Sequence, residues 1–114
     1  MAADPVFPVP SLTFEIQRSG DTQTAICHGR VVAETVPNLQ DEVRRMIAES
    51  RNVVLDLGDV AYADSSGLGA LVGLYVSAKR AGKQLTLINL NRRVRELLRL
   101  TRLLNIFETH GGNR

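Results

Sequence analysis

Three aspartates and two serines lie close together near the middle of the chain, and their chemistry is the most informative in the sequence. They are Asp56, Asp59, Asp64, Ser65 and Ser66. Carboxylates can bind a divalent cation, whereas a serine hydroxyl can act as a nucleophile or accept a phosphoryl group. Strand-end and turn roles explain Asp59 and Asp64, and Asp56 lies within a predicted strand, so we expect no metal site. The serines are the stronger candidates for function.

The segment around the serines changes from strand to helix periodicity. Residues 53–57 are apolar and rich in β-branched side chains, as in a buried strand of a parallel sheet. After a break at Gly58, apolar residues recur at helical spacing, at Leu68, Leu71, Val72 and Tyr75. Asp64 and Ser65 are therefore candidate N-cap residues. Ser66 would follow in the first turn, where free N–H groups and the helix dipole favour a phosphate, so it is either part of a plain helix start or a phosphate acceptor.

Enzyme motifs do not fit the sequence. A Walker loop is absent, and the serines lack the glycine pattern of a nucleophile elbow. The run Gly67-x-Gly69-x-x-x-Gly73 is only faintly similar to a dinucleotide fingerprint, because no acidic residue follows about 20 positions later. Cys27 is the only cysteine and there are two histidines, which argues against a disulfide or a metal site. We expect a protein that is not an enzyme and holds no cofactor.

The predicted elements alternate along the chain after an opening hairpin. Residues 12–17 and 22–28 alternate in polarity around a turn at Gly20, with Cys27 and His28 on opposite faces, one in the core and one exposed. A first helix follows, with Thr35 as N-cap and an inward stripe of Leu39, Val43, Met46 and Ile47. A second helix over about 66–81 ends at Gly82 and leads to a strand at 84–88. A third helix and a short strand at Ile106 and Phe107 complete the order. This order predicts an α/β fold with a mixed, mostly parallel sheet, an N-terminal antiparallel hairpin and helices packed on the sheet.

Composition is typical of one globular domain in the cytoplasm. The chain has 114 residues, of which 44% are hydrophobic and 23% charged. Residues 1–11 should form an extended proline-rich arm, residues 12–110 the domain and residues 111–114 a tail. The sequence has no apolar run long enough to span a membrane and no recognisable signal peptide. A formal net charge of +2 is too slight to indicate nucleic-acid binding.

The six-residue motif in its strand-to-helix setting resembles that of the STAS domain of bacterial anti-sigma factor antagonists. Its residues are Asp64, Ser65, Ser66, Gly67, Leu68 and Gly69, and a looser resemblance extends over about 12–107. The resemblance implies the STAS fold and a partner-binding role for the six residues. In that family the second serine is phosphorylated by a partner that is both a serine kinase and an anti-sigma factor, and the matching position is Ser66. The sequence departs from the family at Val32, where relatives commonly have aspartate, at Arg102, where they tend to have glycine, and in lacking the usual C-terminal helix.

The resemblance implies a protein-interaction switch. The unmodified protein would bind an anti-sigma factor of the histidine-kinase-like ATPase type and thereby release a sigma factor. Phosphorylation of Ser66 would add charge at the interface and weaken binding. We expect no direct contact with nucleic acid or membrane, and the oligomeric state stays open. The alternative is a STAS subunit of an ABC-type transporter complex that docks on its ATPase without phosphorylation.

Two further patterns each allow two interpretations. Arg92, Arg95, Arg99 and Arg102 form a stripe on the third helix that is either its solvated face or a docking surface for an acidic partner. Gly69 and Gly73 lie one turn apart in the second helix, where each glycine costs about 1 kcal/mol relative to alanine. Close packing against the sheet is the simpler explanation of the glycines, and close approach of a partner is the other.

Overall fold

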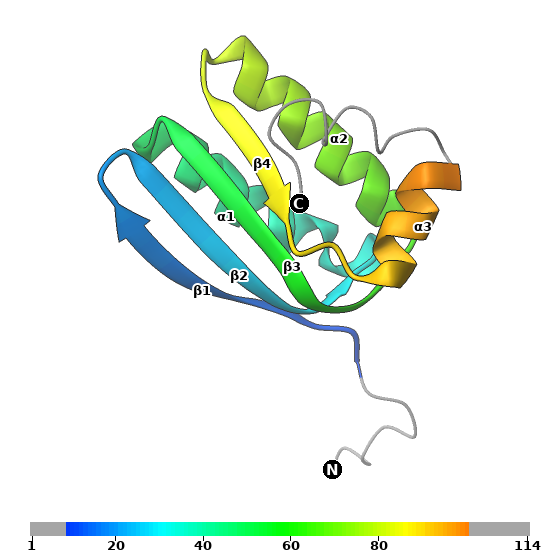
Figure 1. The fold of residues 1–114 in the computed structure, drawn as a ribbon. Helices are drawn as coiled ribbons and strands as arrows, with labels where there is room; N and C mark the ends of the chain where they lie inside the picture. Colours follow the sequence, from blue (N-terminus) through cyan, green and yellow to red (C-terminus); the bar gives the residue numbers. More distant parts are fainter. Residues whose placement is uncertain (1–8, 101–114) are drawn as a thin grey trace.

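A computed structural model of the chain describes residues 9–100 as a sheet with helices against it (Figure 1). The elements in order are β1 (Leu12–Ser19), β2 (Thr22–Val31), the short 3-10 helix η1 (Ala33–Thr35), α1 (Val36–Glu49), β3 (Asn52–Ala63), α2 (Ser65–Arg80), β4 (Gln84–Ile88) and α3 (Arg92–Leu100). The predicted order is confirmed as far as α3. The predicted final strand and most of the predicted arm and tail lie outside the described residues.

The sheet has the order β1-β2-β3-β4, with β1 antiparallel to β2 and the other neighbours parallel. This arrangement confirms the mixed sheet and the opening hairpin, whose turn contains Gly20 at a positive φ of 59°. β3 is longer than predicted, because it continues beyond the register shift near Gly58 and pairs with β2 as far as Ala63. Its period-two burial breaks at Gly58 and Asp59, where the apolar run also stops, which explains why the strand was predicted to end at 57.

The core lies between one face of the sheet and the helices. Figure 1 shows α1 and α2 together on that side of the sheet, and α1 buries the four residues predicted for it. Cys27 points into the core and is fully buried, while His28 lies on the opposite face, as predicted. Burial, and secondarily the carboxylate of Asp56, raise the pKa of the Cys27 thiol to about 12. Within residues 9–100 no helix combines the length and apolar character needed to cross a membrane.

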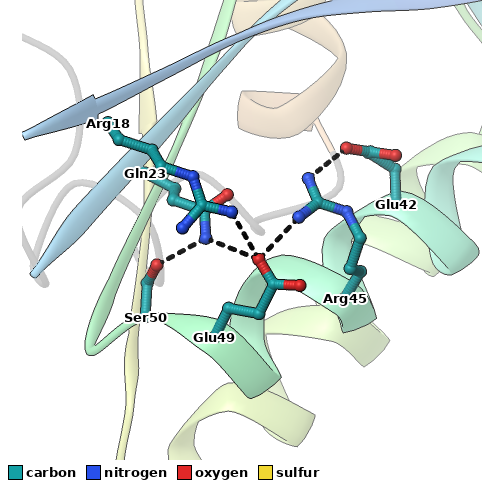
Figure 2. Close-up of polar contacts among 6 residues, drawn as sticks. All are labelled: Arg18, Gln23, Glu42, Arg45, Glu49 and Ser50. Carbon is teal, nitrogen blue, oxygen red and sulfur yellow. Dashed lines mark hydrogen bonds and ion pairs between the residues drawn. The ribbon is translucent and has the colours of Figure 1, made fainter.

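A polar network ties the opening hairpin to the end of α1 (Figure 2). Gln23 is only 1% exposed, and its side-chain amide donates to Ser50 Oγ at 2.7 Å and to Glu49 Oε1 at 3.2 Å. The same Glu49 oxygen accepts from Arg18 at 2.6 Å and from Arg45 at 2.7 Å. The Gln23 bonds and the Arg18 bond join residues that are 26 to 31 positions apart, so they fix the hairpin relative to the helix.

Candidate functional site

The predicted motif forms the turn between β3 and α2. Asp64 has an extended backbone, and its Oδ1 accepts a hydrogen bond from the N–H of Gly67 at 2.9 Å. Asp64 is therefore the N-cap, as predicted, whereas Ser65 is the first residue of the helix. The cap starts α2 in one defined orientation, and this orientation determines where the two serines point.

A second set of contacts joins this turn to the loop after β2. The N–H of Asp64 donates to the carbonyl of Val31 at 3.1 Å, and Asp64 Oδ2 accepts from the N–H of Ala33 at 3.2 Å. Thr35 stabilises the loop from inside, because its hydroxyl accepts from the N–H of Val32 and donates to the carbonyl of Arg30. The expectation that the Thr35 side chain caps α1 is wrong: Thr35 occupies the N-cap position, but its hydroxyl bonds to the preceding loop instead.

Gly67 brings the start of α2 against the end of β2. A Cβ atom on Gly67 would lie 2.0 Å from the carbonyl oxygen of Val31, so only glycine fits this position. Leu68 follows with 3% exposure and belongs to the hydrophobic core. Two of the six predicted site residues, Gly67 and Leu68, are thus buried. They hold the neighbouring residues of the motif in place.

The exposed part of the motif consists of Ser65, Ser66 and Gly69, and the exposed surface continues along α2 through Gly73 and Val76. Among residues 9–100, a Cβ atom on either Gly69 or Gly73 would meet nothing within 4 Å. Packing against the sheet is therefore the wrong explanation for these two glycines. No other described residue covers this side of α2 next to Ser66, which would let another protein approach the helix backbone closely.

The three aspartates of the region serve three separate purposes. Asp56 accepts from the N–H of Gly58 and from the side chain of Asn89. Asp59 pairs with His28 Nδ1 at 2.5 Å, and Asp64 caps α2. Among residues 9–100 no group of three or more acidic, histidine or cysteine side chains is arranged to hold a metal ion. The carboxylates thus have structural roles, and the hydroxyl groups of Ser65 and Ser66 are the exposed reactive groups of the motif.

Val32 lies close to this turn and is 5% exposed. Its apolar side chain occupies the position at which the resemblance leads one to expect a carboxylate. The carboxylate that bonds both to this loop and to the start of α2 is instead that of Asp64, through Ala33 and Gly67.

A second group of residues at this end of the sheet was not found by sequence reasoning. The guanidinium of Arg93 lies 5.7 Å from the centre of the Tyr62 ring, and the side-chain amide of Asn91 donates to the carbonyl of Val60 at 2.5 Å. These contacts hold the start of α3 against the end of β3. Tyr62 comes from a strand and Arg93 from a helix 31 positions later, so no local pattern signals the pair.

Comparisons with known proteins agree with the fold. The STAS domain model matches residues 14–112. The anti-sigma-B factor antagonist of Bacillus subtilis is 32% identical over 92 residues, which cover 81% of this chain and 84% of that protein.

Solved structures show the same fold at lower identity. The Bacillus anti-sigma factor antagonist SpoIIAA has a TM-score of 0.71 in its unphosphorylated form and 0.67 in its phosphorylated form, with 15% and 14% identity. These matches cover 90% of this chain and 88% and 91% of the two SpoIIAA chains. A sulfate transporter family protein from Wolinella succinogenes has a TM-score of 0.71 at 15% identity and covers 82% of this chain and 76% of its own. The match to the family model over nearly all of the chain, together with the sequence relative and the shared fold, means that this chain belongs to the STAS domain family.

Proposed function

We propose that this protein is an anti-sigma factor antagonist whose binding is controlled by phosphorylation of Ser66. In its unmodified form it binds a cytoplasmic anti-sigma factor of the histidine-kinase-like ATPase type, and this binding releases a sigma factor. The observation that carries the proposal is the exposed Ser66 hydroxyl in the first turn of α2, on a turn fixed from beneath by Asp64 and Gly67. The name of the Bacillus subtilis relative supports the same role.

The surface around Ser66 suits reversible binding of a protein. Ser65, Ser66, Gly69 and Gly73 have small side chains or none, so a partner can lie close to α2 and exclude water. A phosphoryl group on Ser66 would add about −1.5 to −2 charges and three acceptor oxygens at the centre of that contact. The positive end of the α2 dipole would tolerate this charge within the protein, so the helix stays folded and the penalty falls on the complex.

The proposed reaction places this chain as the substrate. The partner would transfer the γ-phosphoryl group of its own ATP to Ser66 Oγ, whose proton is lost, and ADP would leave. We expect no catalytic residue, cofactor or metal of this chain to take part. Asp64, Gly67 and Leu68 contribute by holding Ser66 in position, whereas Ser65, Ser66 and Gly69 make the contact.

The test is a binding experiment with matched serine-to-aspartate substitutions. Wild type, Ser66→Ala, Ser66→Asp and Ser19→Asp are used as bait in lysate of the source organism, and captured proteins are identified by mass spectrometry and then purified for titration. Ser19 is exposed at the end of β1, at the opposite end of the sheet from Ser66, so Ser19→Asp adds the same charge away from the proposed contact. We expect an anti-sigma factor with an ATPase domain to bind wild type and Ser19→Asp, and to bind Ser66→Asp at least tenfold more weakly.

Phosphorylation itself is tested with the purified partner and ATP. Incorporation of one phosphate into wild type and none into Ser66→Ala is expected. Modification that persists in Ser66→Ala would contradict the assignment of Ser66.

The alternative function is docking on the ATPase of a transporter complex through the same turn. It is supported by the fold shared with the Wolinella succinogenes protein, whose TM-score equals that of unphosphorylated SpoIIAA. This alternative predicts that transporter subunits bind wild type and Ser66→Asp equally well. Such a result would replace the anti-sigma assignment.

A further inference from the structure

We propose that Tyr62 and the first turns of α3 form a docking surface for an acidic, amphipathic segment of the partner protein. The surface consists of Tyr62, Arg92, Arg93, Glu96 and Leu97, and we call it the Tyr62–α3 patch. The identity of that partner rests on the proposed function, whereas the chemistry of the patch rests on the contacts described below.

The arginines at the start of α3 neither cap the helix nor complement its dipole. Arg92 and Arg93 occupy the first turn, where the dipole disfavours positive charge, and α3 has no acidic residue there. Asn91 already caps the helix, since its side-chain oxygen accepts from the N–H of Val94 at 2.8 Å. Arg92 forms no ion pair with any residue between 9 and 100, so its charge is available to a carboxylate from outside.

Only part of the predicted arginine stripe is therefore available to bind an acidic partner. Arg99 forms two bonds to Glu96 and is thereby neutralised, Arg95 is half-buried, and Arg102 lies outside the described residues. The available positive charge is instead concentrated at Arg92 and Arg93, next to an aromatic ring. This differs from a uniformly solvated helix face, in which charge would be spread along every turn.

The patch also offers an apolar anchor point. Tyr62 is 42% exposed, although it is a large aromatic residue, and Arg93 lies over its ring. Beside it, Arg92, Arg93, Glu96 and Leu97 line a shallow hollow of about 470 Å³. A hollow with an almost entirely apolar lining that two arginines help to form fits a leucine or methionine flanked by carboxylates.

The patch lies at the same end of the sheet as Ser66. Tyr62 is the penultimate residue of β3, and Asp64 caps α2 directly after that strand. A partner that covers Ser66 can therefore reach the patch with an adjoining segment. Because the charges are exposed, their main effect should be on the rate of association and on its salt dependence.

The first experiment needs no partner and uses a synthetic helical peptide of alternating Glu and Leu pairs as the probe. The peptide is titrated into ¹⁵N-labelled wild type, Arg92→Glu and Arg44→Glu, and amide shifts are followed by NMR. Arg44 is exposed on α1 and gives a matched reversal of one charge elsewhere. We expect shifts centred on the amides of Tyr62, Arg92 and Leu97, about fivefold weaker binding for Arg92→Glu, and less than a twofold change for Arg44→Glu. Shifts spread evenly over all exposed arginines would overturn the proposal.

Reversal of charge at Arg92 should not unfold the protein. A glutamate in the first turn is favourable for α3, so circular dichroism of Arg92→Glu should match wild type. Tyr62→Leu provides a second variant that keeps the surface apolar but removes the ring beneath Arg93. It should weaken peptide binding about twofold, and unchanged binding in both variants would overturn the proposal.

The second experiment uses the anti-sigma factor identified with Ser66. We expect Arg92→Glu to slow association about fivefold at 50 mM salt and less at 300 mM, with Arg44→Glu close to wild type. If Ser66→Asp weakens the complex while Arg92→Glu equals Arg44→Glu, the proposed function stands and the patch is wrong. If no anti-sigma factor binds wild type, the proposed function fails and the peptide titration still decides the chemistry of the patch.

Discussion

The two ends of the sheet are fixed by different kinds of contact, although the same strands run through both. At the end where β2, β3 and β4 begin, long side chains reach between elements: Gln23 and Glu49 join the hairpin to α1, and the Lys83 ammonium donates to the carbonyls of Ile47 and Ser50. We call this the clamp end. At the opposite end, the serine end, short side chains and backbone groups of Asp64, Thr35 and Gly67 hold the turn from beneath.

The difference shows how a surface is left free for a partner. At the clamp end the long side chains of Arg18, Arg45 and Glu49 bond to one another at the surface, above the buried Gln23. At the serine end the fixing contacts are made below the surface, so Ser65 and Ser66 remain exposed and unobstructed. Substitutions at the clamp end should therefore change stability alone, whereas those at the serine end should change binding as well.

The largest effect on stability is expected from Gly67→Ala. The new methyl group would lie 2.0 Å from the Val31 carbonyl oxygen, so α2 or β2 must shift, and we expect a loss of about 3 kcal/mol in the free energy of unfolding. Gly73→Ala is the matched control, because its methyl group would contact no other described residue. It should raise the free energy of unfolding by up to about 1 kcal/mol. Urea denaturation measures both, and equal effects of the two variants would refute the close contact at Gly67.

The next effect belongs to the clamp end. Gln23→Ala removes two hydrogen bonds and leaves a small cavity, so we expect a loss of about 2 kcal/mol with partner binding unchanged. Gln17→Ala, at an exposed glutamine of β1, should change stability by less than about 0.5 kcal/mol. A drop in binding by folded Gln23→Ala would show that the two ends are coupled.

A smaller loss of stability, about 1 kcal/mol, is expected for Asp64→Ala, because α2 loses its cap and the bond to Ala33 is broken. Asp64→Asn keeps one acceptor oxygen, so it can cap Gly67 but loses the bond from Ala33, and we expect about half of that loss. Partner titration should nevertheless show weaker binding for Asp64→Ala, since Ser66 is then less well oriented. Partner affinity is compared for Asp64→Ala and Gln23→Ala under conditions where equal fractions of the two variants are folded. Equal affinities would mean that binding depends on stability and not on the position of Ser66.

The smallest effect is a pH dependence of stability that comes from His28, which hydrogen-bonds to both Asp59 and Glu15. Hydrogen bonds to Asp59 on β3 and then to Glu15 on β1 raise the pKa of His28 above its ordinary value of 6.5. A raised pKa in the folded state means that the stabilisation is fully present below pH 6.5 and is lost as pH rises through the folded-state value. The stability difference between wild type and His28→Gln should therefore shrink between pH 6 and pH 9 in urea titrations. In a Glu15→Gln/Asp59→Asn background this pH dependence should disappear.

Sequence reasoning predicted the parts of the fold that depend on local patterns. The hairpin, the buried stripe of α1, the Asp64 cap and the end of α2 at Gly82 each follow from periodicity or from turn and cap chemistry. The length of β3 did not follow, because pairing with β2 continues through a stretch without alternation.

Features made by distant residues could not be predicted. Gly67 and Gly69 look alike in sequence, but only the path of β2 makes Gly67 a contact residue and leaves Gly69 bare. The Gln23 network and the Tyr62–Arg93 pair likewise join segments 26 to 31 residues apart. Local sequence thus placed Ser66 in the first turn of α2, while its supports and the neighbouring patch required the three-dimensional arrangement.

Because Cys27 is buried, chemical labelling of its thiol can measure how often the protein opens. Alkylating reagents react with the thiolate, and a thiol with a pKa of about 12 in the sheet interior is almost entirely protonated at neutral pH. Because it is the only cysteine, each modified molecule is one in which β2 had separated from the core. The rate of labelling would therefore count opening events in the untagged protein, with and without its partner bound.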